Sequence, residues 1–155
     1  ESIHTKLKLN NKQKILMAQY AGYSRCCYYW DLSLTNAAYK DDYQPNVRKL
    51  TEVFTNHTKP LIPWMKNFSS RVYQYTFIHL VKAFKSFFYL EYLQIILGKY
   101  PRFKKKGKSD SFTIDNFGKP IELDRWNHKL PFIGMVKTYG PRQRQQLKKL
   151  LLADK

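Results

Sequence analysis

Residues 69–88 constrain the fold most, because their apolar side chains recur at the spacing of an α-helix. A repeat every three or four residues places these side chains on one side of a helix. The other side is polar and basic, unlike the mixture of Glu and Lys on an ordinary solvated face. We therefore predict a long amphipathic helix with one apolar face (Val72, Tyr73, Tyr75, Leu80, Ala83, Phe84, Phe87, Phe88) and one basic face (Arg71, Gln74, His79, Lys82, Lys85).

The first third of the chain shows the pattern of two helices joined by a short turn. Asn10 and Asn11 can cap a helix over residues 12–20. An apolar stripe (Cys27, Trp30, Leu34 and Ala37 or Ala38) predicts a second helix over residues 24–40. The intervening Ala-Gly-Tyr predicts a break. Such a pair is either an ordinary packing unit, a surface for structured RNA, or a DNA-binding helix-turn-helix.

Strand patterns occur at both ends of the chain. Residues 2–9 alternate between apolar and polar, as in a half-buried strand. Short apolar pieces separated by turn residues predict further strands near the C-terminus. The remaining predicted elements are strands over 111–115, 121–123 and 129–139, a short helix over 46–55, and a basic helix over 142–152.

A net charge of +17 indicates a polyanionic partner, since 28 Lys and Arg stand against 11 Asp and Glu. Nucleic acid, an anionic membrane surface and an acidic protein all remain open on charge alone. An aromatic fraction of 16% favours nucleic acid, because bases stack on exposed rings that lie among cations. No apolar run is long enough for a membrane span, so we expect no membrane partner and a soluble, cytoplasmic protein.

Residues 99–108 form the most concentrated basic run, in which cations alternate with Tyr100 and Phe103 and no acid intervenes. Lys and Arg that contact phosphates gain affinity by releasing counterions. Ser109 and Ser111 can add hydrogen bonds to phosphate oxygens. A solvated loop is the alternative interpretation of this run.

The sequence contains no arrangement typical of a catalytic or metal site. Cys26 and Cys27 are adjacent, so on a helix they point about 100° apart and cannot readily share a disulfide or a metal. The 4 His are scattered. Phosphate-cradling glycine loops and convergent carboxylates are also absent from the sequence. We predict no catalytic residue, no metal site and no cofactor in this chain.

Three groups of motifs resemble the N-terminal half of the TnpB (OrfB) proteins of bacterial insertion sequences, which are relatives of the type V CRISPR effectors. They span most of residues 3 to 139. The groups are LKLNNKQK (7–14) with AGYSR (21–25) and YWDLSL (29–34); Trp64 with SSRVYQ (69–74) and AFKSFF (83–88); and, most specifically, YPRFKKKG (100–107) with SDSFTI (109–114) and KLPFIGMVKTY (129–139).

The resemblance implies an α+β fold in which a helical recognition bundle is inserted into a β-barrel wedge. The wedge is expected over residues 1–10 and 98–140, and the recognition domain over residues 11–97. Residues 141–155 are expected to form a basic helix or the start of a further segment. The implied partners are a guide RNA held by the wedge and double-stranded target DNA, in the bacterial cytoplasm at the nucleoid; the oligomeric state stays open.

The same resemblance assigns roles to residues. Ser70, Arg71 and Gln74 occupy helix positions that the family aims at a transposon-adjacent DNA motif, and Arg and Gln suit bidentate contacts with guanine and adenine. Guide pairing supplies the rest of the specificity. The residues expected to follow nucleic-acid backbones are Lys6, Lys8, Lys12, Arg25, Lys82, Lys85, Tyr100, Arg102, Lys104, Lys105, Lys106, Lys108, Ser109, Ser111, Lys137, Arg142 and Arg144.

The resemblance ends at residue 139 and is interrupted at residues 88–98. The family's RuvC-like nuclease and zinc module have no counterpart after residue 139, so cleavage is not assigned to this chain. Mg and Zn are expected only if a nuclease half exists elsewhere. Two alternatives stay open: a stand-alone DNA-binding regulator or transposition accessory protein that uses the helix pair without RNA, and a non-functional relic.

Overall fold

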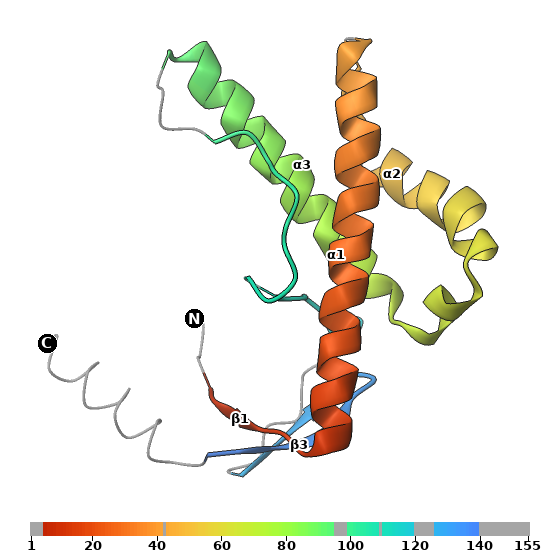
Figure 1. The fold of residues 1–155 in the computed structure, drawn as a ribbon, viewed down its shortest axis with the longest axis vertical. Helices are drawn as coiled ribbons and strands as arrows, with labels where there is room; N and C mark the ends of the chain where they lie inside the picture. The colour runs from red at the N-terminus through yellow and green to blue at the C-terminus, as the bar shows by residue number, and fades with distance from the viewer. Residues whose placement is uncertain (1–4, 42, 95–98, 109, 120–125, 140–155) are drawn as a thin grey trace, which may run out of the picture. The chain divides into compact units, whose positions relative to one another are not determined.

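The computed structural model describes residues 5–41, 43–94, 99–108, 110–119 and 126–139. The chain divides into two compact units: a sheet unit (Glu1–Met17 with Asp115–Lys155) and a helical unit (Ala18–Ile114). The elements, in chain order, are β1 (Leu7–Lys8), α1 (Asn11–Lys40), α2 (Val47–Val53), the short turns η1 (Phe54–Thr58), η2 (Lys59–Leu61) and η3 (Pro63–Asn67), α3 (Ser70–Tyr92), β2 (Asn127–Leu130) and β3 (Gly134–Thr138) (Figure 1).

The long helix predicted from residue 69 is confirmed as α3. It begins after Ser69, whose hydroxyl accepts a hydrogen bond from the Arg71 N–H at 3.2 Å and so caps the first turn. Of the predicted apolar face, Val72, Tyr73, Leu80 and Phe84 are buried, whereas Ala83 is exposed. Phe77, which the prediction did not include, is fully buried. Trp30 of α1 packs against Phe77 and Phe54 at ring-centroid distances of 5.4 Å and 5.0 Å. An aromatic core thus joins α1, α3 and the chain after α2.

The predicted helix-turn-helix is wrong, because α1 is one continuous helix of 30 residues (Figure 1). Gly22 lies inside it, and Tyr20 and Tyr23 on either side are each 1% exposed. Both of these rings pack against Phe68. Burying a large apolar side chain stabilises by roughly 1.5–3 kcal/mol, whereas a helical glycine costs roughly 1 kcal/mol. Tertiary packing therefore overrides the local tendency to break.

The short helix predicted over 46–55 corresponds to α2 and the turn η1 that follows it. Asn46 caps α2 by accepting a hydrogen bond from the Lys49 N–H at 2.8 Å. Leu50 is buried. No helix in the described ranges combines the length and apolar character needed to cross a bilayer.

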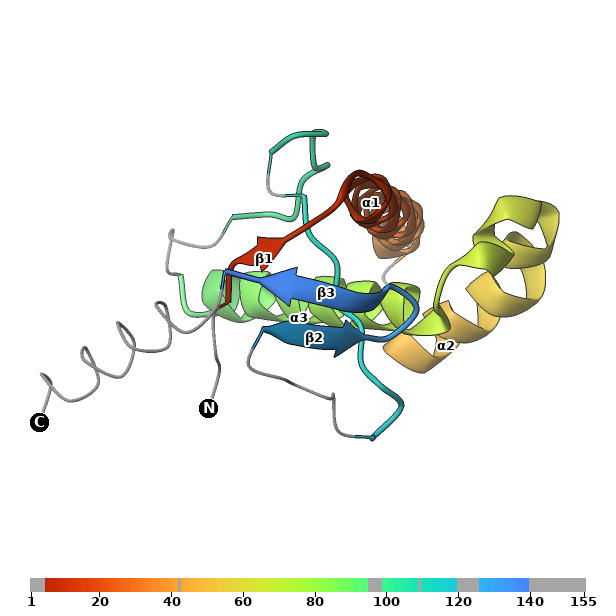
Figure 2. The same cartoon turned by 90° about the horizontal axis from the view of Figure 1, so that it is seen from below.

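The sheet unit contains an antiparallel sheet in the order β1-β3-β2 (Figure 2). Its buried face carries Val136 and His128, which pair across β3 and β2. α1 starts directly after β1 because Asn10 and Gln13 form a reciprocal cap, with N–H to side-chain oxygen distances of 3.1 Å and 2.8 Å. The Gln13 side chain also donates to the Met135 carbonyl at 2.8 Å, which ties the start of α1 to β3.

The predicted β-barrel wedge is wrong: within the described residues the sheet is open and has three strands. A barrel requires strands that close on themselves through a consistent stagger. Residues 111–115 belong to no strand, because Phe112 stacks on Tyr20 of α1 (5.1 Å between centroids) instead of joining a sheet. The strand predicted over 129–139 is a hairpin instead, reversing at Phe132 and Gly134 with φ of 64° and 91°.

Three other predicted elements lie partly or wholly outside the described residues. They are the start of the strand over 2–9, the strand over 121–123 and the helix over 142–152.

Candidate nucleic-acid interface

The basic segment (residues 99–108) follows a defined path across the helical unit because tyrosines anchor it. Tyr100 packs its ring against Phe84 of α3, at 5.4 Å between centroids, and its hydroxyl donates to the Asn36 side chain of α1. Burial raises the pKa of Tyr100, so this hydroxyl stays a donor at neutral pH. The predicted phosphate contact at Tyr100 is therefore also a structural anchor.

Aromatic rings of α1 meet the cations of the basic segment at what we call the basic platform: Tyr28, Tyr29, Arg102, Phe103 and Lys104. The Tyr28 hydroxyl donates to the Arg102 carbonyl at 2.8 Å. The Lys104 ammonium lies 4.6 Å from the centre of the Tyr28 ring. Phe103 meets Tyr29 edge to face at 5.1 Å and is 58% exposed. Exposed rings beside cations are the arrangement on which unpaired bases stack.

The lysines that follow Phe103 are exposed and close together along the chain. Within the described ranges, no carboxylate pairs with Lys104, Lys105 or Lys106. Neighbouring unpaired cations repel one another, and phosphates would relieve that repulsion. Lys108 and Arg102 are exposed on the same segment.

The residues predicted to read a DNA motif lie together in the first turn of α3. Ser70 is its first residue. The Arg71 guanidinium donates to the Gln74 side-chain oxygen at 3.1 Å, and both side chains are half-buried. The structure thus brings Arg71 and Gln74 together, and their role in base recognition stays a prediction.

Among the described residues, four of the predicted backbone contacts belong to the sheet unit. Lys8 and Lys137 lie directly opposite each other in the β1–β3 register, and both are exposed. Like charges opposite each other destabilise a strand pair, so a bound anion would stabilise this face. Lys6 lies 5.0 Å over the Tyr139 ring, and Lys12 is exposed near the start of α1.

The other predicted contacts lie in the helical unit or outside the described residues. Lys82 and Lys85 are exposed on α3, and Ser111 is exposed on the residues after the basic segment. Arg25 of α1 forms an ion pair with Asp110 at 2.8 Å. Ser109, Arg142 and Arg144 lie outside the described residues.

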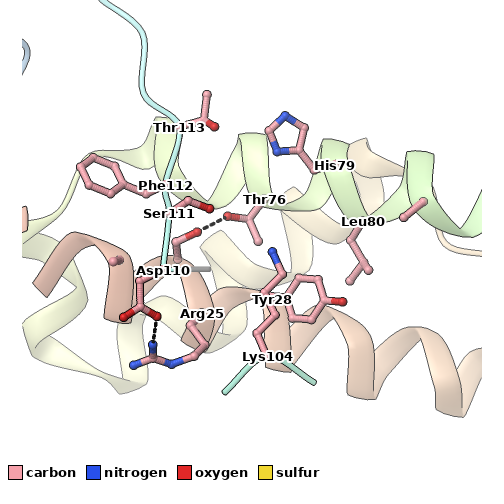
Figure 3. A pocket seen from close by; sticks show the side chains of 13 residues that line it. Arg25, Tyr28, Thr76, His79, Leu80, Lys104, Asp110, Ser111, Phe112 and Thr113 are labelled. Carbon is pink, nitrogen blue, oxygen red and sulfur yellow. Dashed lines mark hydrogen bonds and ion pairs between the residues drawn. The ribbon is translucent and has the colours of Figure 1, made fainter. Parts of the chain in front are cut away.

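Sequence reasoning missed a pocket in the helical unit (Figure 3). It has a volume of about 200 Å³ and is enclosed by α1, α3 and residues 110–113. Its walls come from three separate segments, so no local pattern marks it. In the described residues, no three His, Cys, Asp or Glu side chains gather as a metal site would require.

No protein-family model matches the chain, and a search of the curated proteins finds no match. Function is therefore inferred from the described geometry together with the sequence resemblance.

Proposed function

We propose that this chain binds nucleic acid through the basic segment, as the guide-RNA- and target-DNA-binding portion of a TnpB-like protein. The supporting observation is a run of exposed lysines with no carboxylate partner among the described residues, anchored to α1 through Tyr28 and Tyr100. Anchoring lowers the entropy lost when the segment orders on a ligand. The exposed ring of Phe103 beside the lysines adds stacking to the phosphate contacts.

The chemistry of each side chain determines whether we propose a phosphate contact or a base contact for it. Lys104, Lys105 and Lys106 contact phosphates without regard to sequence. Arg71 and Gln74 read base edges of a short motif in duplex DNA. Such a protein acts in the bacterial cytoplasm at the nucleoid, and any cleavage belongs to a nuclease outside this chain.

The alternative of a stand-alone regulator with a helix-turn-helix receives less support. It requires two helices set at an angle, whereas residues 11–40 form the single helix α1.

Replacing Lys104, Lys105 and Lys106 together with Ala tests the proposal. Three lost phosphate contacts should reduce the slope of log affinity against log salt by about 2 for single-stranded RNA. The matched control replaces Arg48, Lys49 and Lys66, which are exposed cations outside the basic segment, and removes the same net charge. Fluorescence anisotropy over a salt series gives both slopes. Equal slopes in the two triple variants would show that the basic segment is not the contact surface.

A further inference from the structure

The pocket in the helical unit has a size and a wall structure that suit one ring system. Its volume of about 200 Å³ is below the roughly 300–1,000 Å³ of pockets for drug-sized ligands. Phe112 forms part of the wall and is held by stacking on Tyr20, with ring centroids 5.1 Å apart and an interplanar angle of 27°. Thr76, His79 and Leu80 line the α3 side (Figure 3).

One side of the pocket carries two cations, Arg25 and Lys104, together with the carboxylate of Asp110. Arg25 is held in place by Asp110 at 2.8 Å, and the second oxygen of Asp110 accepts the Gly107 N–H at 3.0 Å. Lys104 lies over Tyr28, so its ammonium is also positioned (Figure 3). The Asp110 carboxylate offsets the charge of Arg25, so Lys104 supplies the net positive charge here. Its positioned ammonium, beside the guanidinium N–H groups of Arg25, suits a single phosphate.

The hydroxyl groups of the pocket present acceptors to a ligand. Thr76 donates its only hydroxyl hydrogen to the Val72 carbonyl at 2.8 Å. The Ser24 hydroxyl, 3.1 Å from the Thr76 hydroxyl, must then be the donor of that pair. Ser24 is left with acceptor lone pairs, which match the exocyclic amino group of a base.

We propose that this pocket receives one unstacked nucleobase that carries an exocyclic amino group, with its phosphate beside Arg25 and Lys104. Cytosine, adenine and guanine carry such a group, and uracil and thymine do not. Tyr28 and Lys104 belong to both the pocket and the basic platform, so a strand lying on the platform passes the pocket mouth. The inference rests on the proposed function and adds a base preference to it.

Oligocytidine and oligouridine test this preference, because they are similarly flexible and differ in the group at C4. The wild-type chain should bind oligocytidine RNA about fivefold more tightly than oligouridine, as one additional hydrogen bond allows. Ala83→Leu, which fills the pocket from α3, should abolish the preference, so that oligocytidine and oligouridine bind with equal affinity. Ser24→Ala should have the same effect through loss of the acceptor.

The control variant is Ala37→Leu, an exposed alanine of α1 outside the pocket, which should keep the preference. Circular dichroism checks the folding of each variant. The same comparison with oligodeoxycytidine and oligodeoxyuridine shows whether the pocket takes the base from RNA alone or from DNA also. Equal wild-type affinities for the two bases, or a preference that survives Ala83→Leu, would overturn the pocket assignment and leave the proposed function standing. Failure to bind any of the oligonucleotides would overturn both.

Discussion

The carboxyl group of Asp31 lies in the interior of the helical unit, with a side chain that is 0% exposed. Thr35 donates to one carboxylate oxygen at 2.9 Å, and the other has no hydrogen-bond partner among the described residues. Burial raises the pKa of Asp31 to about 7, against the smaller opposing effect of the Thr35 bond.

The predicted apolar stripe of α1 includes Leu34, which is 37% exposed. The buried stripe is thus rotated on α1, which brings Asp31 inside.

Asp31→Asn should stabilise the chain at pH 8 and much less at pH 4. The folded-state pKa of Asp31 lies above its unfolded value near 4, so its contribution to stability falls as pH rises from about 4 to about 7. The amide cannot ionise but still accepts the Thr35 bond. The difference between the two pH values should be on the order of a few kcal/mol.

Urea unfolding of the wild type and the variant at both pH values measures this difference. Asp41→Asn is the matched control, because Asp41 is exposed. A gain that is the same at both pH values would contradict a raised pKa at Asp31.

At the scale of elements, apolar periodicity located α2 and α3, whereas α1 shows where local rules fail. Gly22 is a typical break residue, yet a Cβ there would meet only the Arg25 guanidinium, at 3.8 Å. The position therefore needs neither the small size nor the conformational freedom of glycine. Gly107, with φ of 80°, does need that freedom.

Gly22→Ala should stabilise the chain by about 0.5–1 kcal/mol, because alanine is the better helix former at a helical position with open space. Gly107→Ala, the contrasting variant in the same unit, should destabilise it, since its backbone has a positive φ. Thermal unfolding followed by circular dichroism measures both effects. Destabilisation by Gly22→Ala would indicate a turn at this position and restore the two-helix interpretation.

For the whole molecule, the dominant property is a net charge of +17, which favours association with polyanions over a range comparable to the Debye length. Such a charge also promotes unspecific binding. In the proposed function, discrimination among nucleic acids comes from positioned groups such as those of the basic platform and the pocket, because charge alone does not distinguish sequences.

Purification of the chain from bacterial cells at moderate salt should retain one defined RNA, as a guide-binding protein would. Sequencing of the bound RNA measures this. The Lys104, Lys105 and Lys106 triple variant should retain less of it than the Arg48, Lys49 and Lys66 control. A random mixture of RNAs would argue against a guide and leave a basic protein that binds nucleic acid without selection.

The sequence by itself determined α2, α3, the presence of strand structure within residues 129–139 and the position of the basic segment, but not the reversal that makes residues 127–138 a hairpin. These features depend on side-chain periodicity, caps and charge within a few neighbouring residues, all of which can be read locally. The tertiary structure alone decided that α1 is continuous and that Asp31 is buried. It alone also decided that Phe112 packs on Tyr20 instead of joining a sheet, and that three segments enclose a pocket. Each of these depends on contacts between residues far apart in the chain, and burial in those contacts outweighs local propensity.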